Sequence, residues 1–170
     1  MRKLKGRIIL LVLFISLSFS AFTQKDGYYN NLYSALKTPD NVRILDLKKK
    51  RLKEFPIEIL KLNNLEKLIL SRNSISFVPC EITNLKKLKY LDLSSNNIDA
   101  LPDEMSLMKI DSLILWDNPI RKFPREFSKI GVLYLDLRAI QMNKEEQEVI
   151  KSIFPYTRIR MDNPCYCNPR

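Results

Sequence analysis

The sequence contains no histidine and only three glycines and three cysteines among its 170 residues. Without histidine, Ser-His-Asp and Cys-His catalytic groups and imidazole metal ligands are excluded. The few glycines argue against a glycine-rich loop that would hold a phosphate group. We therefore expect a chain that is not an enzyme and that carries no cofactor and no metal ion.

A long hydrophobic run is also missing. The longest apolar stretch, from Ile8 to Phe19, has 12 residues, whereas a membrane-spanning helix needs about 20. Four basic residues precede it and small residues follow it, which is the order of a secretory signal peptide. We expect residues 1–23 to be this signal, cleaved after Ser20 or after Thr23. The resulting location would be the periplasm, the cell surface or the medium, and an uncleaved anchor is the alternative.

What the sequence does contain is one pattern of residues that returns five times. Similar segments begin at Val42, Leu65, Leu88, Ile110 and Val132, so that successive starts lie 23, 23, 22 and 22 residues apart. In every segment the fourth and sixth residues are leucine and their neighbours are mostly polar, as a strand with one buried face requires. A second apolar set follows in each repeat. No single repeat can bury both sets, so neighbouring repeats must stack.

Asparagine occupies the ninth position of the three central repeats, as Asn73, Asn96 and Asn118. An amide side chain offers two donors and an acceptor, so these residues can satisfy backbone groups of adjacent coils at a buried turn. Lys50 and Ile140 stand at this position in the first and last repeats. Those departures suit terminal coils, which have only one stacked neighbour.

The phrase LxxLxLxxNxIxxLPxxIxxLxx resembles the leucine-rich-repeat family in its bacterial-type form of about 23 residues. It covers residues 42–142, with four full repeats and one truncated repeat. The resemblance implies an α/β fold, a right-handed solenoid in which a parallel sheet lines the concave side. It also implies a module that binds other molecules and seldom catalyses reactions.

The two flanks are expected to cover the ends of the solenoid. Residues 24–41 form an N-terminal cap with a short helix before Pro39, and its tyrosines are expected to belong to the core. Residues 143–170 form a C-terminal cap in which Asn143 and Glu146 have the spacing of a helix capping box. An edge strand that buries Ile159 and Met161 should follow that helix.

The cysteines leave several arrangements open. A disulfide between Cys165 and Cys167 would form in an oxidising compartment, although its ring is small. Free thiols and intermolecular pairing are the alternatives. Cys80 lies several coils from the tail, so we expect no bridge between them.

Outward positions of the strands supply the candidate binding residues. If the family geometry holds, the third, fifth, seventh and eighth residues of each repeat face away from the core. Aromatic and arginine anchors dominate binding energies at interfaces, whereas scattered apolar residues on a surface are normal. The predicted partner-binding residues are Ile69, Arg72, Tyr90, Asp92, Ile114, Trp116, Tyr134 and Arg138.

Aspartates recur at the fifth position, in the first, third and fifth repeats, as Asp46, Asp92 and Asp136. Because Ile69 and Ile114 stand between them, consecutive carboxylates should lie two strands apart, at about 9.6 Å. That separation is too wide for a shared metal ion or a coupled acid-base pair. We expect solvated charges beside basic neighbours.

The leading interpretation is an exported, non-catalytic module that binds a protein or peptide through the concave face. The net charge of +10 falls to +6 when a cleaved signal removes four basic residues, which suggests a binder of polyanions or of the envelope surface as the alternative. Part of that charge lies in Lys48–Lys53, "KKKRLK". A structural, self-associating envelope protein is a further alternative, nucleic acid is not favoured, and a membrane surface stays open as a partner.

Overall fold

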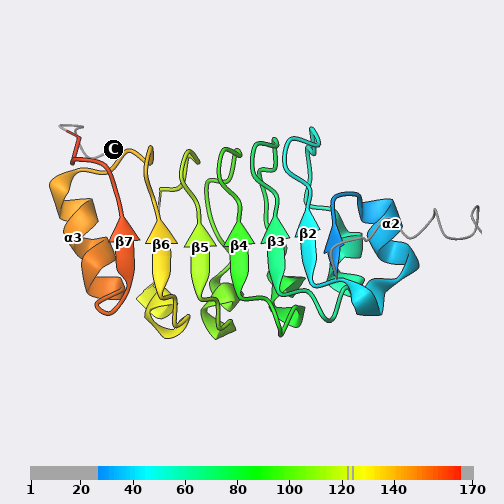
Figure 1. Ribbon diagram of the computed structural model, residues 1–170. Helices are drawn as coiled ribbons and strands as arrows, with labels where there is room; N and C mark the ends of the chain where they lie inside the picture. Colours follow the sequence, from blue (N-terminus) through cyan, green and yellow to red (C-terminus); the bar gives the residue numbers. More distant parts are fainter. Residues whose placement is uncertain (1–26, 122, 124, 166–170) are drawn as a thin grey trace, which may run out of the picture.

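Seven short parallel strands lie side by side in one open sheet, in the order in which they occur along the chain (Figure 1). The computed structural model describes residues 27–121, 123 and 125–165, so the predicted signal peptide and Cys167 lie outside the described residues. The strands are β1 (Tyr28–Tyr29), β2 (Ile44–Asp46), β3 (Lys67–Ile69), β4 (Tyr90–Asp92), β5 (Ser112–Ile114), β6 (Tyr134–Asp136) and β7 (Arg158–Arg160). The expected solenoid with a parallel sheet is confirmed.

The fourth-position leucines hold the repeats in register. They pair from strand to strand, and all five are fully buried: Leu45, Leu68, Leu91, Leu113 and Leu135. Their neighbours at positions three and five face the opposite side of the sheet. Each repeat therefore contributes one side to the core and leaves the other side open.

Short 3-10 helices return the chain from each strand to the next. They are η1 (Pro39–Asn41), η2 (Ile57–Lys61), η3 (Cys80–Asn84), η4 (Asp103–Leu107) and η5 (Arg125–Lys129). Proline is the N-cap residue of η2, η3 and η4, where its fixed φ favours the entry into a helical turn. In Figure 1 these helices lie below the sheet, at the edge opposite the turns that follow the strands.

The repeated asparagines hold neighbouring coils together. Asn96 donates from Nδ2 to the carbonyl of Leu70 in the preceding coil, at 3.1 Å, and to that of Leu93 in its own coil, at 2.8 Å. Its Oδ1 accepts from the backbone N–H of Ile75, at 3.0 Å. Asn73 and Asn118 make the same three bonds in their coils. The predicted role of these residues is confirmed.

The eighth residue of each repeat, which lies just before the ninth-position residue, adopts a left-handed backbone conformation in all five repeats. The residues are Lys49, Arg72, Ser95, Asp117 and Ala139, with φ between 51° and 58°. This region costs L-residues about 1 kcal/mol or more. The four in the first four repeats donate their backbone N–H to the seventh-position carbonyl of the next coil, for example Lys49 to Ser71 at 3.1 Å, which offsets that cost.

A short N-terminal helix covers the first coil. Helix α2 (Leu32–Lys37) begins at Asn31, whose side chain accepts from the backbone N–H of Ser34. Tyr29 is buried as expected, but Tyr33 is 72% exposed and has Lys37 Nζ 4.5 Å from its ring centroid. The expectation that Tyr33 belongs to the core is wrong, because a helix of six residues turns only Ala35 fully inward.

A helix and a strand close the C-terminal end. Helix α3 (Lys144–Ile153) begins with the predicted capping box, in which Asn143 and Glu146 exchange side-chain to backbone bonds of 2.9 and 2.7 Å. Ile159 in β7 packs against the core while the arginines on either side of it are exposed. Among the described residues, the buried core extends from Tyr29 to Phe154, and the chain from Gln24 onward contains these residues.

We predict that Asn96→Ala lowers the free energy of unfolding by at least about 2 kcal/mol, because it leaves buried backbone groups without partners. Urea denaturation measures this loss. The matched control is Asn97→Ala, since Asn97 is exposed and its side chain makes no hydrogen bond with the described residues. That variant should stay within about 0.5 kcal/mol of the wild type, and equal losses in both would contradict the role of Asn96.

Candidate functional site

The open side of the sheet carries two rows of side chains in register, which together we call the strand face. The third-position row runs Ile44, Lys67, Tyr90, Ser112, Tyr134 and Arg158. The fifth-position row runs Asp46, Ile69, Asp92, Ile114, Asp136 and Arg160. Aromatic, acidic and basic residues are therefore mixed on one face, with the tyrosines near its middle.

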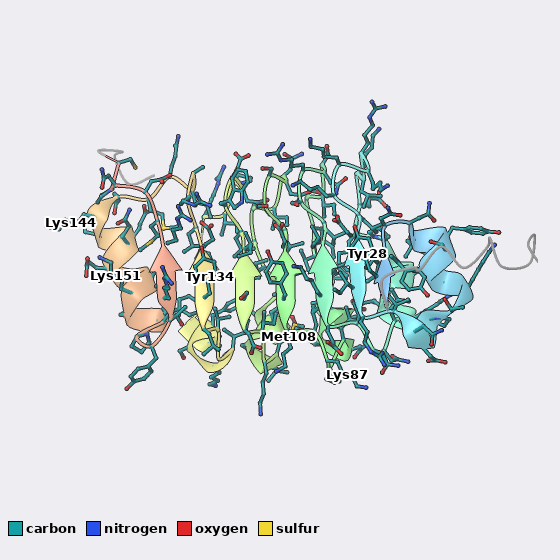
Figure 2. The ribbon with its side chains drawn as sticks, viewed as in Figure 1. Tyr28, Lys87, Met108, Tyr134, Lys144 and Lys151 are labelled. Atoms are coloured by element: carbon teal, nitrogen blue, oxygen red, sulfur yellow. The ribbon has the colours of Figure 1, made fainter. Side chains whose placement is uncertain are left out.

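Two tyrosines stand on either side of the small residue Ser112. Tyr90 and Tyr134 lie on β4 and β6, each one strand away from it, and both are half-buried. Lys67 Nζ lies 4.2 Å from the centroid of the Tyr90 ring, a cation-π contact. Figure 2 shows Tyr134 over β6 and Tyr28 toward the other end of the sheet. Because Tyr28 pairs with Ile44, it belongs to the same row, and tyrosines occur at several points along the face.

The environment of Tyr90 is partly desolvated and negative. Burial raises the pKa of its hydroxyl, and the nearby charges of Asp92, Tyr134 and Asp136 raise it further. The three acidic groups that act on Tyr90 come from β4 and β6. The hydroxyl therefore stays protonated and is available as a hydrogen-bond donor or acceptor.

The fifth-position aspartates complete the ends of their strands. In the first, third and fifth repeats the carboxylate accepts from the backbone N–H two residues ahead: Asp46 from Lys48 at 3.0 Å, Asp92 from Ser94 at 3.0 Å and Asp136 from Arg138 at 3.2 Å. This local side-chain to backbone bond stabilises a turn. Within the described residues no group of three acidic or cysteine side chains is placed to hold a metal ion.

Asp136 also forms a bidentate ion pair with Arg138. Arg138 donates from Nε to Oδ1 at 2.9 Å and from Nη2 to Oδ2 at 2.7 Å. Burial raises the pKa of Asp136, but the hydrogen bonds from Arg138 and the charges of Arg138 and Arg160 outweigh burial and lower it below its usual value. Asp136 is almost fully buried, so the expectation of a solvated charge is wrong for this residue.

In the repeats with isoleucine at the fifth position, some backbone N–H and side-chain hydroxyl groups have no hydrogen-bond partner among the described residues. No hydrogen bond joins the N–H of Ser71 or of Trp116 to another described residue. The hydroxyl of Ser94 donates to Asp92 at 2.6 Å, whereas the buried hydroxyl of Ser71 has no partner among the described residues, because Ile69 offers no acceptor. Aspartate and isoleucine repeats therefore present different polar groups on the same face.

The structure corrects two expectations about outward positions. Ile114 is only 8% exposed, and it lies between Asp92 and Asp136 on the adjacent strands, about 4.8 Å away on each side. Ser71 and Ser94 at the seventh position are each 2% exposed rather than outward. Ile114 thus supports the face from below and offers little area to a partner.

The other predicted residues fall into two groups. Ile69, Tyr90, Asp92, Trp116, Tyr134 and Arg138 are partly exposed on or beside the strand face. Arg72 is exposed but lies in the turn that follows β3, where its N–H donates to the carbonyl of Ser94. It therefore lies beside the turn that follows β2 and not beside the tyrosines. Lys67 and Ser112 also lie beside the tyrosines at outward third positions. They are missing from the predicted set, because one repeat read alone does not show which residues become neighbours.

The structure describes two of the three cysteines. Cys80 carries a free thiol, whereas Cys165 belongs to a disulfide. Its expected pairing with Cys167 stays a prediction, because Cys167 lies outside the described residues. No helix within the described residues is both long and apolar enough to cross a bilayer.

We predict that Asp136→Asn lowers the free energy of unfolding at pH 7 by about 1 kcal/mol, an amount reduced because Arg138 is 37% exposed and partly screened. Since the folded state lowers the pKa of Asp136, the carboxylate stabilises the fold above the unfolded value of about 3.9. That contribution is lost as the pH falls through the lower folded value. Urea denaturation of both proteins from pH 7 downward should show the difference shrinking.

The control for this prediction is Asp111→Asn. Asp111 is 54% exposed and lies 3.9 Å from Lys89, an exposed pair of the kind that contributes little. Its loss should change stability by less than about 0.5 kcal/mol. A difference between wild type and Asp136→Asn that stayed constant down to the lowest pH would contradict a role for the charge.

Comparisons with known proteins agree with this architecture. Residues 40–98 match the leucine-rich-repeat family, and no curated protein matches the chain significantly in sequence. A leucine-rich-repeat protein of Leptospira interrogans is 24% identical with a TM-score of 0.55, over 81% of this chain and 48% of its own. Internalin C2 of Listeria monocytogenes is 17% identical with a TM-score of 0.62, over 78% of this chain and 57% of its own.

A third similar structure is TLR13 in its complex with ssRNA13, which is 24% identical with a TM-score of 0.62 over 81% of this chain and 20% of its own. The chain thus spans about half the length of the first two proteins and a fifth of TLR13. At these identities the likeness shows the fold alone. Together with the match over residues 40–98, these likenesses show that the chain folds as a leucine-rich-repeat solenoid.

Proposed function

We propose that this protein is an exported, non-catalytic binding module that recognises an extended segment of another protein through its strand face. The observation that carries the proposal is that three aromatic residues on or beside the strand face, Tyr90, Tyr134 and Trp116, are partly exposed although the fold does not need them there. Aromatic side chains supply much of the binding energy at interfaces, because they bury a large rigid area.

The size of the face favours a peptide or a loop as the partner. Five repeats at about 4.8 Å and about 13 Å of strand length make a surface of about 300 Å². A stable protein interface takes about 800 Å² from each partner. The strand face alone is therefore too small for a tight complex between globular surfaces, and it fits one extended segment.

An open polar group supports the same kind of partner. The backbone N–H of Trp116, a partly exposed residue, has no acceptor among the described residues, and a carbonyl or side chain of an extended segment can provide one. Charged residues on or beside the two rows, such as Lys67, Asp92 and Arg138, add directional contacts. Apolar anchors with polar groups around them are the usual composition of a recognition surface.

Export is a separate part of the proposal and rests on residues 1–23. Its test is the N-terminal sequence of the protein recovered from the envelope and the medium. A chain that begins at Ala21 or Gln24 supports export, and a chain found only in the cytoplasm with its first residues intact contradicts it.

We predict that Tyr90→Ala with Trp116→Ala lowers affinity for the partner at least about tenfold, because it removes two anchors of the face. The chain from Gln24 onward is used as bait for envelope and extracellular fractions, the captured partner is identified by mass spectrometry, and its Kd is measured by calorimetry with both baits. Circular dichroism confirms that the variant is folded.

The matched control replaces two aromatic residues away from the face, Phe77→Ala with Tyr156→Ala, which are 67% and 96% exposed. The control should bind like the wild type. A partner that binds the Tyr90 and Trp116 variant and the wild type equally well would move the binding site elsewhere, and capture of no partner from any fraction would contradict the proposal.

A further inference from the structure

The turn that follows β2 is the most basic part of the described surface. We call it the basic turn, and it comprises Lys48, Lys49, Lys50, Arg51 and Lys53 together with Arg72 of the next repeat. All six side chains are exposed. The backbone bonds from Lys49 to Ser71 and from Leu52 to Asn73 set the two turns side by side. In Figure 1 the basic turn lies at the upper edge of the sheet, above β2 and β3.

These side chains form no ion pairs within the described residues, where the ion pairs join other residues. The equivalent positions seven to twelve contain five basic residues and no acidic one in the first repeat, but no basic residue and one acidic residue, Asp99, in the third. Along the edge of the sheet formed by the turns that follow the strands, the positive charge is thus concentrated at the N-terminal end.

The fold does not require this concentration. The third repeat makes the same turn with Ser94, Ser95, Asn96 and Asn97, and Ser95 has nearly the φ of Lys49, 51° against 57°. At the ninth position Lys50 is tolerated because β1 has only two residues and no repeat precedes the first one. Like charges this close repel one another, so the cluster costs stability and needs another explanation.

We propose that the basic turn binds the surface of a bilayer that contains anionic phospholipids. Clusters of four to eight lysines and arginines attract such surfaces, and they act within about a Debye length, roughly 8 to 10 Å. The turn projects from the edge of the solenoid, which suits contact with a flat surface more than with a strand lying in a groove. It exposes no aromatic side chain on which the bases of a single-stranded nucleic acid would stack.

The contact is electrostatic and reversible. Leu52 packs against the core, so no exposed apolar side chain in the basic turn is available to enter the lipid, and added salt should release the protein. Because the basic turn occupies an edge, the strand face stays open while the protein is bound. This inference does not depend on the proposed recognition of a peptide, and either can fail without the other.

The test uses the chain from Gln24 onward, so that the apolar run before it cannot enter the bilayer. Cosedimentation is measured with phosphatidylcholine vesicles that contain about 30% phosphatidylglycerol and with pure phosphatidylcholine vesicles. We expect binding to the anionic vesicles only, and a loss of at least about tenfold when NaCl rises from about 50 to about 300 mM.

The decisive variant replaces the basic residues of the turn after β2 with uncharged polar residues like those of the third repeat: Lys48→Ser, Lys49→Ser, Lys50→Asn, Arg51→Asn and Lys53→Ser. It should bind anionic vesicles at least about tenfold more weakly while its circular dichroism and urea midpoint show an intact fold. A control removes the same charge from scattered exposed positions: Lys61→Gln, Lys86→Gln, Lys109→Gln, Lys129→Gln and Lys144→Gln. It should keep its binding within about threefold.

Three results would overturn the inference. Equal losses in the two variants would mean that net charge alone attracts the vesicles. No preference of the wild type for anionic vesicles would remove the membrane as the ligand. Tight binding of heparin or of a single-stranded RNA in parallel titrations, without binding to the vesicles, would make a soluble polyanion the ligand of the basic turn.

Discussion

The hydrogen bonds of Asn73, Asn96 and Asn118 are the interaction on which the rest of this structure depends. Each amide joins two coils through backbone groups that no other residue of the turn can reach, and two of the three side chains are buried. Backbone groups left unpaired in such a position cost free energy comparable to a lost hydrogen bond. Stacking of the leucines supplies the core, but the asparagines set how one coil sits on the next.

This arrangement separates the structural residues from those available for binding. Leucines and asparagines face the interior, while positions three and five of every repeat lie in two rows on the opposite side of the sheet, where all but Ile114 and Asp136 are partly exposed. These outer positions accept tyrosine, lysine, aspartate or serine at little cost to the fold. Neighbouring repeats therefore offer a surface whose chemistry is adjustable one residue at a time, as in other solenoids.

The charged residues divide in the same way. Asp136 and Arg138 form a partly buried pair that belongs to the stability of the sheet end, and the aspartates of alternate repeats cap their own strands. The charged side chains of the basic turn, in contrast, form no ion pairs within the described residues. Charge with a structural partner and charge without one thus lie on different parts of the molecule.

The sequence by itself determined the repeat boundaries, the buried leucines, the asparagine bonds and the α3 capping box, because each depends on spacing along the chain and on the chemistry of one side chain. Only the tertiary structure decided which outward residues are accessible. Ile114 and Asp136 are buried although their positions in the repeat alternate outward. The eighth residues have a left-handed backbone although none of them is glycine. Contacts between repeats, more than 20 residues apart in the chain, set these features, so no single repeat contains the information.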